Sequence, residues 1–145
     1  MPAAVETKMN WLARVCLFGL AIFLIVLLGI AAWLPPSPQG YGTHQGLGLP
    51  RCTILELFGV RCPSCGMTTA WAHLMRGNVV YALHANTGGT LLGLLAMMTS
   101  PWLLVSSWRG KWWLVVPNEW ALLLVFLIVF AITFVDWIVR LRFVA

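Results

Sequence analysis

Residues 15–34 form an unbroken run of 20 residues without a charged side chain. An α-helix rises about 1.5 Å per residue, so about 20 residues are needed to cross the hydrocarbon core of a bilayer. Pro35, Pro36 and Pro38 follow the run, and proline cannot continue the hydrogen-bond ladder of a helix. The run therefore predicts a membrane-spanning helix. It is too long for the apolar region of a signal peptide, so we expect it to be retained.

Two further apolar runs predict two more spanning helices, over about residues 90–107 and 117–139. Pro117 suits the first turn of the third span. The composition agrees, because 61% of the 145 residues are hydrophobic and only 9% are charged, against about 25% charged in a soluble domain. The expected fold class is an all-α membrane protein with three transmembrane helices, which form a single membrane domain over residues 1–145.

The segment between the first and second spans, residues 35–86, is the long polar part of the chain. Residues 35–51 are rich in proline and glycine and are predicted to be loop. Residues 66–76 and 79–84 have helical composition. We therefore expect a cysteine-containing loop and short interfacial helices that pack on the membrane surface.

Three of the four cysteines, Cys52, Cys62 and Cys65, fall in this polar segment. The last two belong to the sequence Cys-Pro-Ser-Cys-Gly, and two thiolates at this spacing can converge on one metal ion about 2.3 Å from each sulfur. Cys52 supplies a third sulfur, which makes the three residues a candidate zinc site. Cys16 lies in the first apolar run and is expected to be a small buried hydrophobe.

A closed zinc site needs a fourth ligand. His73 follows Cys65 by eight residues, which is about 12 Å along one straight helix, so His73 is excluded. His44, in the proline-rich loop, and His84, beyond the break at Gly77, remain candidates. Neither spacing singles one of them out.

Thiol–disulfide chemistry is the alternative interpretation of the same cysteines. A Cys-Pro-x-Cys sequence just before a helix places Cys62 near unpaired amides that lower a thiol pKa, and Arg61 adds positive charge. Cys62 and Cys65 would then be the catalytic pair of a membrane oxidoreductase, with Cys52 as exchange partner. A static disulfide from Cys52 to Cys62 or Cys65 is the third interpretation.

The charged residues flank the apolar runs. Nine Lys and Arg against four Asp and Glu give a net charge of +5, without the basic cluster that a nucleic-acid surface needs. The lipid bilayer is therefore the expected partner, and nucleic acid is not. Arg14 precedes the first span, whereas the next charge after that span is Arg51. This asymmetry favours an inside N-terminus and an outward-facing cysteine loop, whereas Arg140 and Arg142 after the third span argue for the opposite orientation.

Two short-range patterns accompany the later spans. Gly89 and Gly93 have the Gly-x3-Gly spacing that lets another helix approach closely, which would suit a membrane-protein partner or a homo-oligomer. Packing within the chain or against lipid is the other interpretation of this spacing. Asp136 lies one helical turn before Arg140, and the two are predicted to form an ion pair near the membrane edge.

Over residues 48–107 the chain resembles a bacterial family of small multi-pass membrane proteins of unknown function. The shared core is Cys-Pro-x-Cys-Gly-x-Thr at residues 62–68, and Cys52 precedes it by ten residues. Thr69, Asn78 and Thr87 stand where that family often has Arg, Asp and Pro. The resemblance implies the multi-pass architecture, the thiol motif and the bacterial inner membrane, and it supplies no activity.

No Ser-His-Asp set, phosphate loop or pair of catalytic carboxylates is visible in the sequence. We therefore expect a non-enzymatic membrane subunit or scaffold in which a metal ion or a disulfide at Cys52, Cys62 and Cys65 keeps the loop folded. The alternative is a membrane thiol–disulfide oxidoreductase that uses Cys62 and Cys65.

Overall fold

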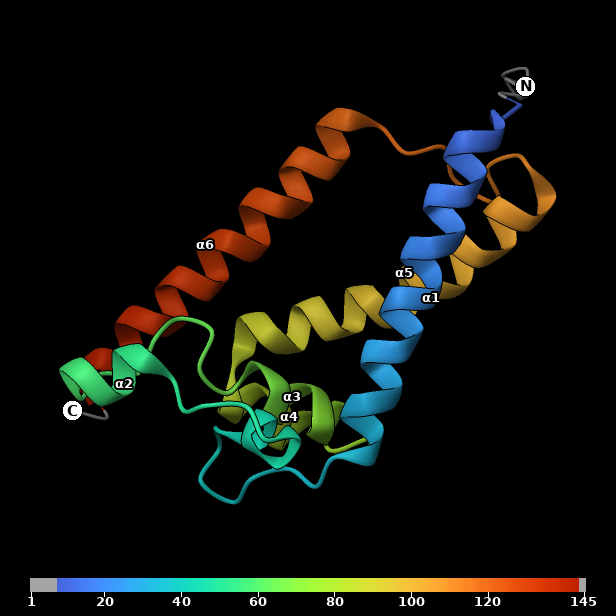
Figure 1. Ribbon diagram of the computed structural model, residues 1–145. Coiled ribbons are helices and arrows are strands. Elements are labelled where there is room, and N and C mark those ends of the chain that lie inside the picture. Colours follow the sequence, from blue (N-terminus) through green and yellow to red (C-terminus); the bar gives the residue numbers. More distant parts are fainter. Residues whose placement is uncertain (1–7, 144–145) are drawn as a thin grey trace.

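The computed structural model describes residues 8–143, and this range is helical without a strand. Three helices are long and apolar enough to cross a membrane, namely α1 (Trp11–Trp33), α5 (Thr87–Arg109) and α6 (Glu119–Phe143). The predicted all-α membrane protein with three spanning helices is therefore confirmed (Figure 1). Four shorter helices lie between α1 and α5: η1 (Thr43–Leu47), α2 (Thr53–Phe58), α3 (Met67–Leu74) and α4 (Val79–Ala85).

Side-chain caps explain where two of the spanning helices begin. Asn10 accepts a hydrogen bond from the amide of Ala13 at 2.8 Å, so α1 starts before the uncharged run and includes Arg14. Asn86 accepts one from the amide of Gly89 at 2.6 Å and so caps α5. The expected start of the third span at Pro117 is wrong, because α6 begins at Glu119.

Helices α1 and α5 pack against each other, and both carry small buried residues. Ala21 on α1 and Ala96, Ser100 and Ser106 on α5 are all buried. Small side chains at such positions let two helix backbones approach closely, which is how helices pack where lipid removes the hydrophobic driving force. Cys16 was expected to be buried, but it is exposed on the surface of α1.

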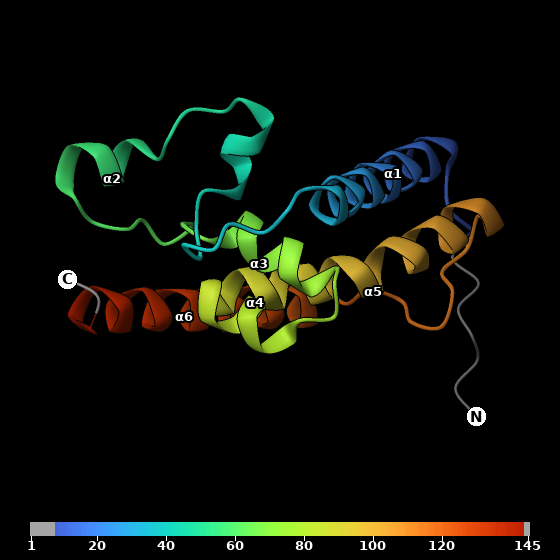
Figure 2. The same cartoon turned by 90° about the horizontal axis from the view of Figure 1, so that it is seen from below.

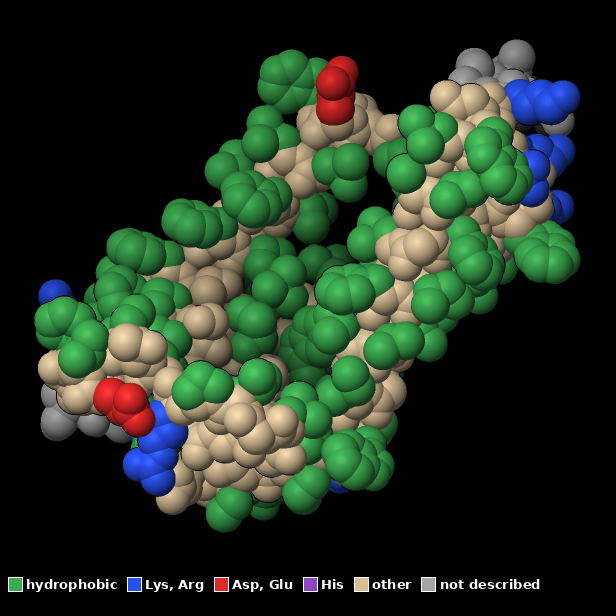
Figure 3. All heavy atoms as spheres, viewed as in Figure 1, with side chains coloured by type: hydrophobic (Ala, Val, Ile, Leu, Met, Phe, Trp, Pro, Cys, Tyr) green, Lys and Arg blue, Asp and Glu red, His purple; other side chains and the backbone are tan. Residues whose placement is uncertain are grey.

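Helix α6 leans away from the other two spanning helices (Figure 1). It meets α5 where Thr133 lies against Gly88, and a Cβ atom on Gly88 would collide with the Thr133 side chain. No residue of the most apolar part of α6 is buried within the chain, and hydrophobic side chains line this helix in Figure 3. Its surface is therefore covered by lipid or by another membrane protein.

Residues 35–86 lie at one end of the spanning helices, and we call this segment the cap (Figures 1 and 2). The predicted helices at residues 66–76 and 79–84 are present as α3 and α4, and their buried apolar residues cluster: Ala70, Leu74, Ala82 and Ala85. The segment predicted as loop contains the 3-10 helix η1, in which the hydroxyl of buried Thr43 lies 2.8 Å from that of Thr69. This buried contact between the two hydroxyl groups stabilises η1 against α3.

The Gly-x3-Gly face of α5 packs within the chain. A Cβ atom on Gly93 would lie 2.8 Å from Leu74, and one on Gly89 would lie 3.0 Å from Met67, both on α3. The indole of Trp71 donates a hydrogen bond to the carbonyl of Gly89 at 2.8 Å. The close approach that the spacing predicts is therefore made by α3 of the same chain.

Candidate functional site

Three cysteine sulfurs converge in the cap. The Sγ atoms of Cys52, Cys62 and Cys65 all lie within 4.8 Å of one another, and those of Cys62 and Cys65 are 3.1 Å apart. Cys52 precedes α2, while Cys62 and Cys65 lie in the turn before α3. All four cysteines of the chain are free thiols, so the structure does not contain the static disulfide considered from the sequence.

We call residues 62–65 the cysteine turn. A backbone hydrogen bond and the glycine that follows, Gly66, give this turn its shape. The amide of Cys65 donates to the carbonyl of Cys62 at 3.0 Å. Gly66 follows with φ +90°, and a Cβ atom there would lie 2.8 Å from the carbonyl oxygen of Gly40 and even closer to that of Ala85. Only glycine suits both this backbone conformation and this close approach.

Asn86 connects the cysteine turn to the start of α5. Its amide nitrogen donates to the carbonyl oxygens of Pro63 at 2.9 Å and Cys65 at 3.1 Å, while its oxygen caps the helix at Gly89. The side chain is completely buried. One asparagine therefore satisfies three backbone groups and fixes the orientation of the turn relative to a spanning helix.

Helix α6 holds the other side of the cysteine turn. Arg140 donates to the carbonyl oxygens of Cys65 at 3.1 Å and Ala85 at 3.3 Å. The indole of Trp137 donates to the carbonyl of Arg61 at 2.7 Å. Arg140 also pairs with Asp136 at 2.5 Å, which confirms the predicted ion pair.

Asp136 extends this network to α5, since it accepts a hydrogen bond from the hydroxyl of Thr87 at 2.9 Å. The sequence showed the ion pair but not its place beside the cysteines. Two charges inside an otherwise apolar helix indicate a nearby polar contact, but they do not show which residues make it.

The cysteines line a pocket of about 220 Å³ that opens toward η1. Cys62 and Cys65 are buried and Cys52 is half-buried, so the pocket gives a small ligand access to all three sulfurs. Cys52 and Cys62 also line a second cavity of about 440 Å³, whose lining includes Thr133 of α6. The thiols are thus sheltered from bulk solvent and still reachable.

The two cysteines of the turn differ in acidity. Burial raises the pKa of Cys62, but hydrogen bonds with Ser64, Cys65 and Cys52 outweigh this effect and leave the pKa below its usual value. Burial, followed by the hydrogen bonds with Cys62 and Cys52, raises the pKa of Cys65 to about 12. Cys62 is therefore the more acidic thiol of the pair and Cys65 the less acidic one.

The predicted causes of a low thiol pKa are not those that the structure shows. Helix α3 begins at Met67, so Cys62 lies ahead of the helix rather than in its first turn. The Arg61 guanidinium lies 4.4 Å above the centre of the Tyr41 ring. Hydrogen bonds with Ser64, and then with Cys65 and Cys52, lower the pKa of Cys62 instead.

The three histidines occupy different places relative to the sulfurs. His44 lines the same pocket, and its Nε2 lies 3.2 Å from the carbonyl oxygen of Pro50. His84 is exposed on α4 and is not part of this pocket. His73 stacks on Tyr81 with ring centres 5.5 Å apart, and burial, then the charge of Arg76, lowers its pKa.

Comparisons with known proteins identify one family. No curated protein and no solved structure matches the chain. A family model does match residues 52–99, which run from the first cysteine of the cap through α3 and α4 into α5. In this segment, the chain is similar to the family described as "Protein of unknown function (DUF2752)".

Proposed function

We propose that Cys52, Cys62 and Cys65 of the cap bind one thiophilic metal ion, with zinc as the first candidate. In this proposal the chain is a non-enzymatic membrane subunit or scaffold whose cap the ion holds in shape. The observation that carries the proposal is the convergence of three sulfurs from two separate segments to within 4.8 Å of one another.

The distances suit a thiolate site. Zinc–sulfur bonds of about 2.3 Å in a tetrahedral site place the sulfurs about 3.8 Å apart. The sulfurs of Cys62 and Cys65 are 3.1 Å apart, so binding requires them to separate by about 0.7 Å. Both cysteines lie in one turn, where small side-chain rotations provide that movement.

A fourth ligand would enter from the pocket. His44 lines the pocket and His84 does not, so His44 is the better candidate of the two. Its Nε2 would give up the contact with the carbonyl of Pro50 to reach the ion. If a water molecule took this position instead of His44, the ion would have three cysteine ligands and one exchangeable ligand.

Helix α2 explains why a bound ion would matter to the fold. This six-residue helix has no buried residue, no side-chain cap and no packing contact with another helix. It stands apart from α6 in Figure 2. Cys52 comes directly before α2, so a metal bond at its sulfur would anchor the helix to the rest of the cap.

Elemental analysis of the protein, purified in detergent under reducing conditions and loaded with zinc, tests the proposal. We expect about one zinc per chain, a loss of most of it in Cys52→Ser and Cys62→Ser, and no loss in Cys16→Ser, whose sulfur is exposed on α1. A wild-type protein that holds no more zinc than the Cys62→Ser variant would refute the metal site.

Thiol–disulfide exchange is the second candidate, favoured by the 3.1 Å separation of the Cys62 and Cys65 sulfurs. The Cys62 thiolate would attack a protein disulfide and release one substrate thiolate. Cys65 would then pass its proton to the released substrate thiolate and attack the mixed disulfide, which forms a Cys62–Cys65 bond and releases the second thiolate. The substrate disulfide gains two electrons and the cysteine pair loses two.

The Cys65→Ser variant separates the two candidates. Exchange predicts that this variant accumulates a mixed disulfide through Cys62 when it is incubated with an oxidised protein substrate. The metal site predicts instead that the variant binds zinc more weakly and forms no such adduct. Cys62→Ser is the control, since it removes the attacking sulfur.

We further propose an inside N-terminus and an outward-facing cap in the bacterial inner membrane. The cationic side chains at the start of α1 and the end of α5 support this orientation. A membrane-impermeant maleimide added outside whole cells should label Cys52 in the metal-free protein without lysis. Labelling only after lysis would reverse the proposed orientation.

The scaffold role also requires a partner, for which α6 is the available surface. The most apolar part of this helix is unburied within the chain. Extraction in mild detergent should recover a stoichiometric membrane-protein partner or a homo-oligomer. A monomer without a partner would argue against the scaffold and leave the metal site unaffected.

A further inference from the structure

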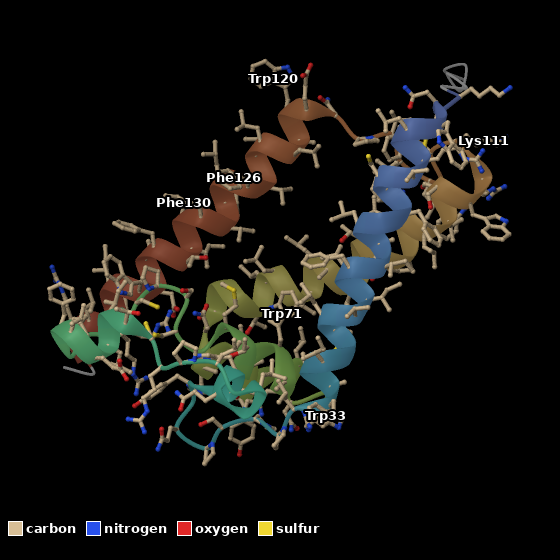
Figure 4. All side chains as sticks on the ribbon, in the orientation of Figure 1. Trp33, Trp71, Lys111, Trp120, Phe126 and Phe130 are labelled. Atoms are coloured by element: carbon tan, nitrogen blue, oxygen red, sulfur yellow. The ribbon has the colours of Figure 1, made fainter. Side chains whose placement is uncertain are left out.

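Four cationic side chains gather at the end of the molecule opposite the cap. Lys8, Arg14, Arg109 and Lys111 line one open cavity of about 480 Å³ together with Met9 and Gly110. Lys and Arg side chains cluster at this end in Figure 3, and Figure 4 shows Lys111 beside the start of α1. We call this cavity the basic pocket.

The fold builds the basic pocket by joining the start of α1 to the end of α5. Arg14 donates to the carbonyl oxygens of Ser107 at 3.0 Å and Trp108 at 3.1 Å. The amide of Met9 donates to the carbonyl of Gly110 at 3.0 Å. These bonds fix two segments about 100 residues apart in sequence, so the cationic groups are brought together by tertiary structure.

Every charged residue that the structure describes in the lining of the basic pocket is cationic. Lys8 and Arg109 are exposed, so their charges are accessible from outside. Trp120, at the start of α6, points away from this end of α1 and α5 in Figure 4. The pocket therefore offers a positive surface suited to an anion.

Tryptophans place the basic pocket at the level of the lipid headgroups. Trp11 begins α1 with 77% of its surface exposed, and Trp108 near the end of α5 is 79% exposed. Exposed tryptophans at the ends of spanning helices mark the membrane–water interface, where the phosphates of lipids lie. A lipid phosphate is thus the anion that this pocket would meet first.

We propose that the basic pocket binds the phosphate headgroup of an anionic phospholipid. Arginine and lysine form charge-assisted hydrogen bonds with phosphate oxygens, and each basic residue near an anionic bilayer contributes to attraction. Lipid binding there would hold the α1–α5 junction together. The inference does not depend on the cysteine site, because the two lie at opposite ends of the molecule (Figure 1).

Thermal unfolding of the full chain in detergent, with added lipid, tests the site. Phosphatidylglycerol should raise the unfolding midpoint by about 3–6 °C, and phosphatidylcholine should not. The double variant Lys8→Gln/Arg109→Gln should lose this rise. The matched control Arg51→Gln/Arg142→Gln removes the same charge from exposed positions outside the pocket and should keep it.

Native mass spectrometry supplies a second measurement. Retention of one phosphatidylglycerol molecule should fall at least about fivefold in the pocket variant and remain in the control. An equal rise with phosphatidylcholine, or an equal loss of the rise in both variants, would overturn the proposal. If inorganic phosphate alone gave the whole rise, the pocket would be a free-anion site and the lipid assignment would be wrong.

Discussion

The guanidinium of Arg140 lies 3.1 Å from the carbonyl oxygen of Cys65, a residue 75 positions earlier in the chain. Through this contact the last spanning helix supports the cysteine turn directly. The same arginine pairs with Asp136. The Arg140 side chain is 12% exposed and the Asp136 side chain 20% exposed. The cysteine turn, the first residues of α5 and the end of α6 are therefore joined by one set of hydrogen bonds.

Replacing Arg140 with glutamine should destabilise the protein by about 2 kcal/mol. The change removes two bonds to backbone carbonyls and leaves the partly buried Asp136 carboxylate without its counter-ion. Unfolding in mixed micelles measures the free energy. Arg142→Gln, an exposed neighbour on the same helix, should change it by less than about 0.5 kcal/mol, and equal effects of the two variants would contradict the role of Arg140.

Replacing Asn86 with alanine should cost at least about 2 kcal/mol. The buried side chain caps α5 and holds the carbonyls of Pro63 and Cys65, so its loss leaves three backbone groups without partners. Asn78 precedes α4 without a side-chain cap bond, which makes Asn78→Ala a matched control. Comparable unfolding free energies for the two variants would show that the Asn86 bonds contribute little.

Gly66→Ala should destabilise the cap more than Gly59→Ala. Both glycines have positive φ, +90° and +65°, so alanine costs about 1 kcal/mol of backbone strain at either position. Only at Gly66 would the added Cβ also meet the carbonyls of Gly40 and Ala85. Thermal midpoints of the two variants isolate the steric part, and a Gly66→Ala midpoint at or above that of Gly59→Ala would contradict the close approach.

Alkylation of the metal-free, reduced protein should modify Cys62 before Cys65 as the pH rises. The lowered pKa of Cys62 provides its thiolate at the lower pH, whereas the pKa of Cys65, about 12, keeps that thiol protonated through pH 10. Iodoacetamide rates, mapped by mass spectrometry from pH 6 to 10, measure the order. Faster modification of Cys65 would reverse the assignment.

The raised pKa of Cys65 also predicts the direction of an effect on stability. A folded-state pKa above the unfolded value favours the fold at low pH, and this contribution is lost as the pH rises toward 12. The free energy of unfolding should therefore fall less steeply between pH 9 and pH 11 in Cys65→Ala than in the wild type. Parallel slopes would show that this thiol does not titrate as described.

The spanning helices could be predicted because bilayer thickness and backbone hydrogen bonding leave few alternatives for a long apolar run. Their ends were less predictable, since Asn10 extends α1 past Arg14 by a side-chain bond. The turn η1 was missed because its reason is tertiary, namely the contact between Thr43 and Thr69. The Gly89 and Gly93 face was predicted to receive a helix, but its spacing does not say which helix.

In the candidate site, too, the local pattern could be predicted and the tertiary contacts could not. The spacing of Cys62 and Cys65 and the nearby Cys52 predicted the convergence of sulfurs, which follows from a short chain and a tight turn. The support from Trp137 and Arg140 could not be predicted, because it depends on the direction in which α6 leaves the membrane. A local ion pair in a sequence does not reveal what else its partners contact.

The bond between Arg140 and the cysteine turn also sets an order of events during synthesis. A ribosome adds about 5–20 residues per second, so several seconds separate the emergence of Cys65 from that of Arg140. During this interval the three sulfurs are already made, while the helix that supports them is not. The cysteine turn of a nascent chain is therefore complete before its support from α6 has been synthesised.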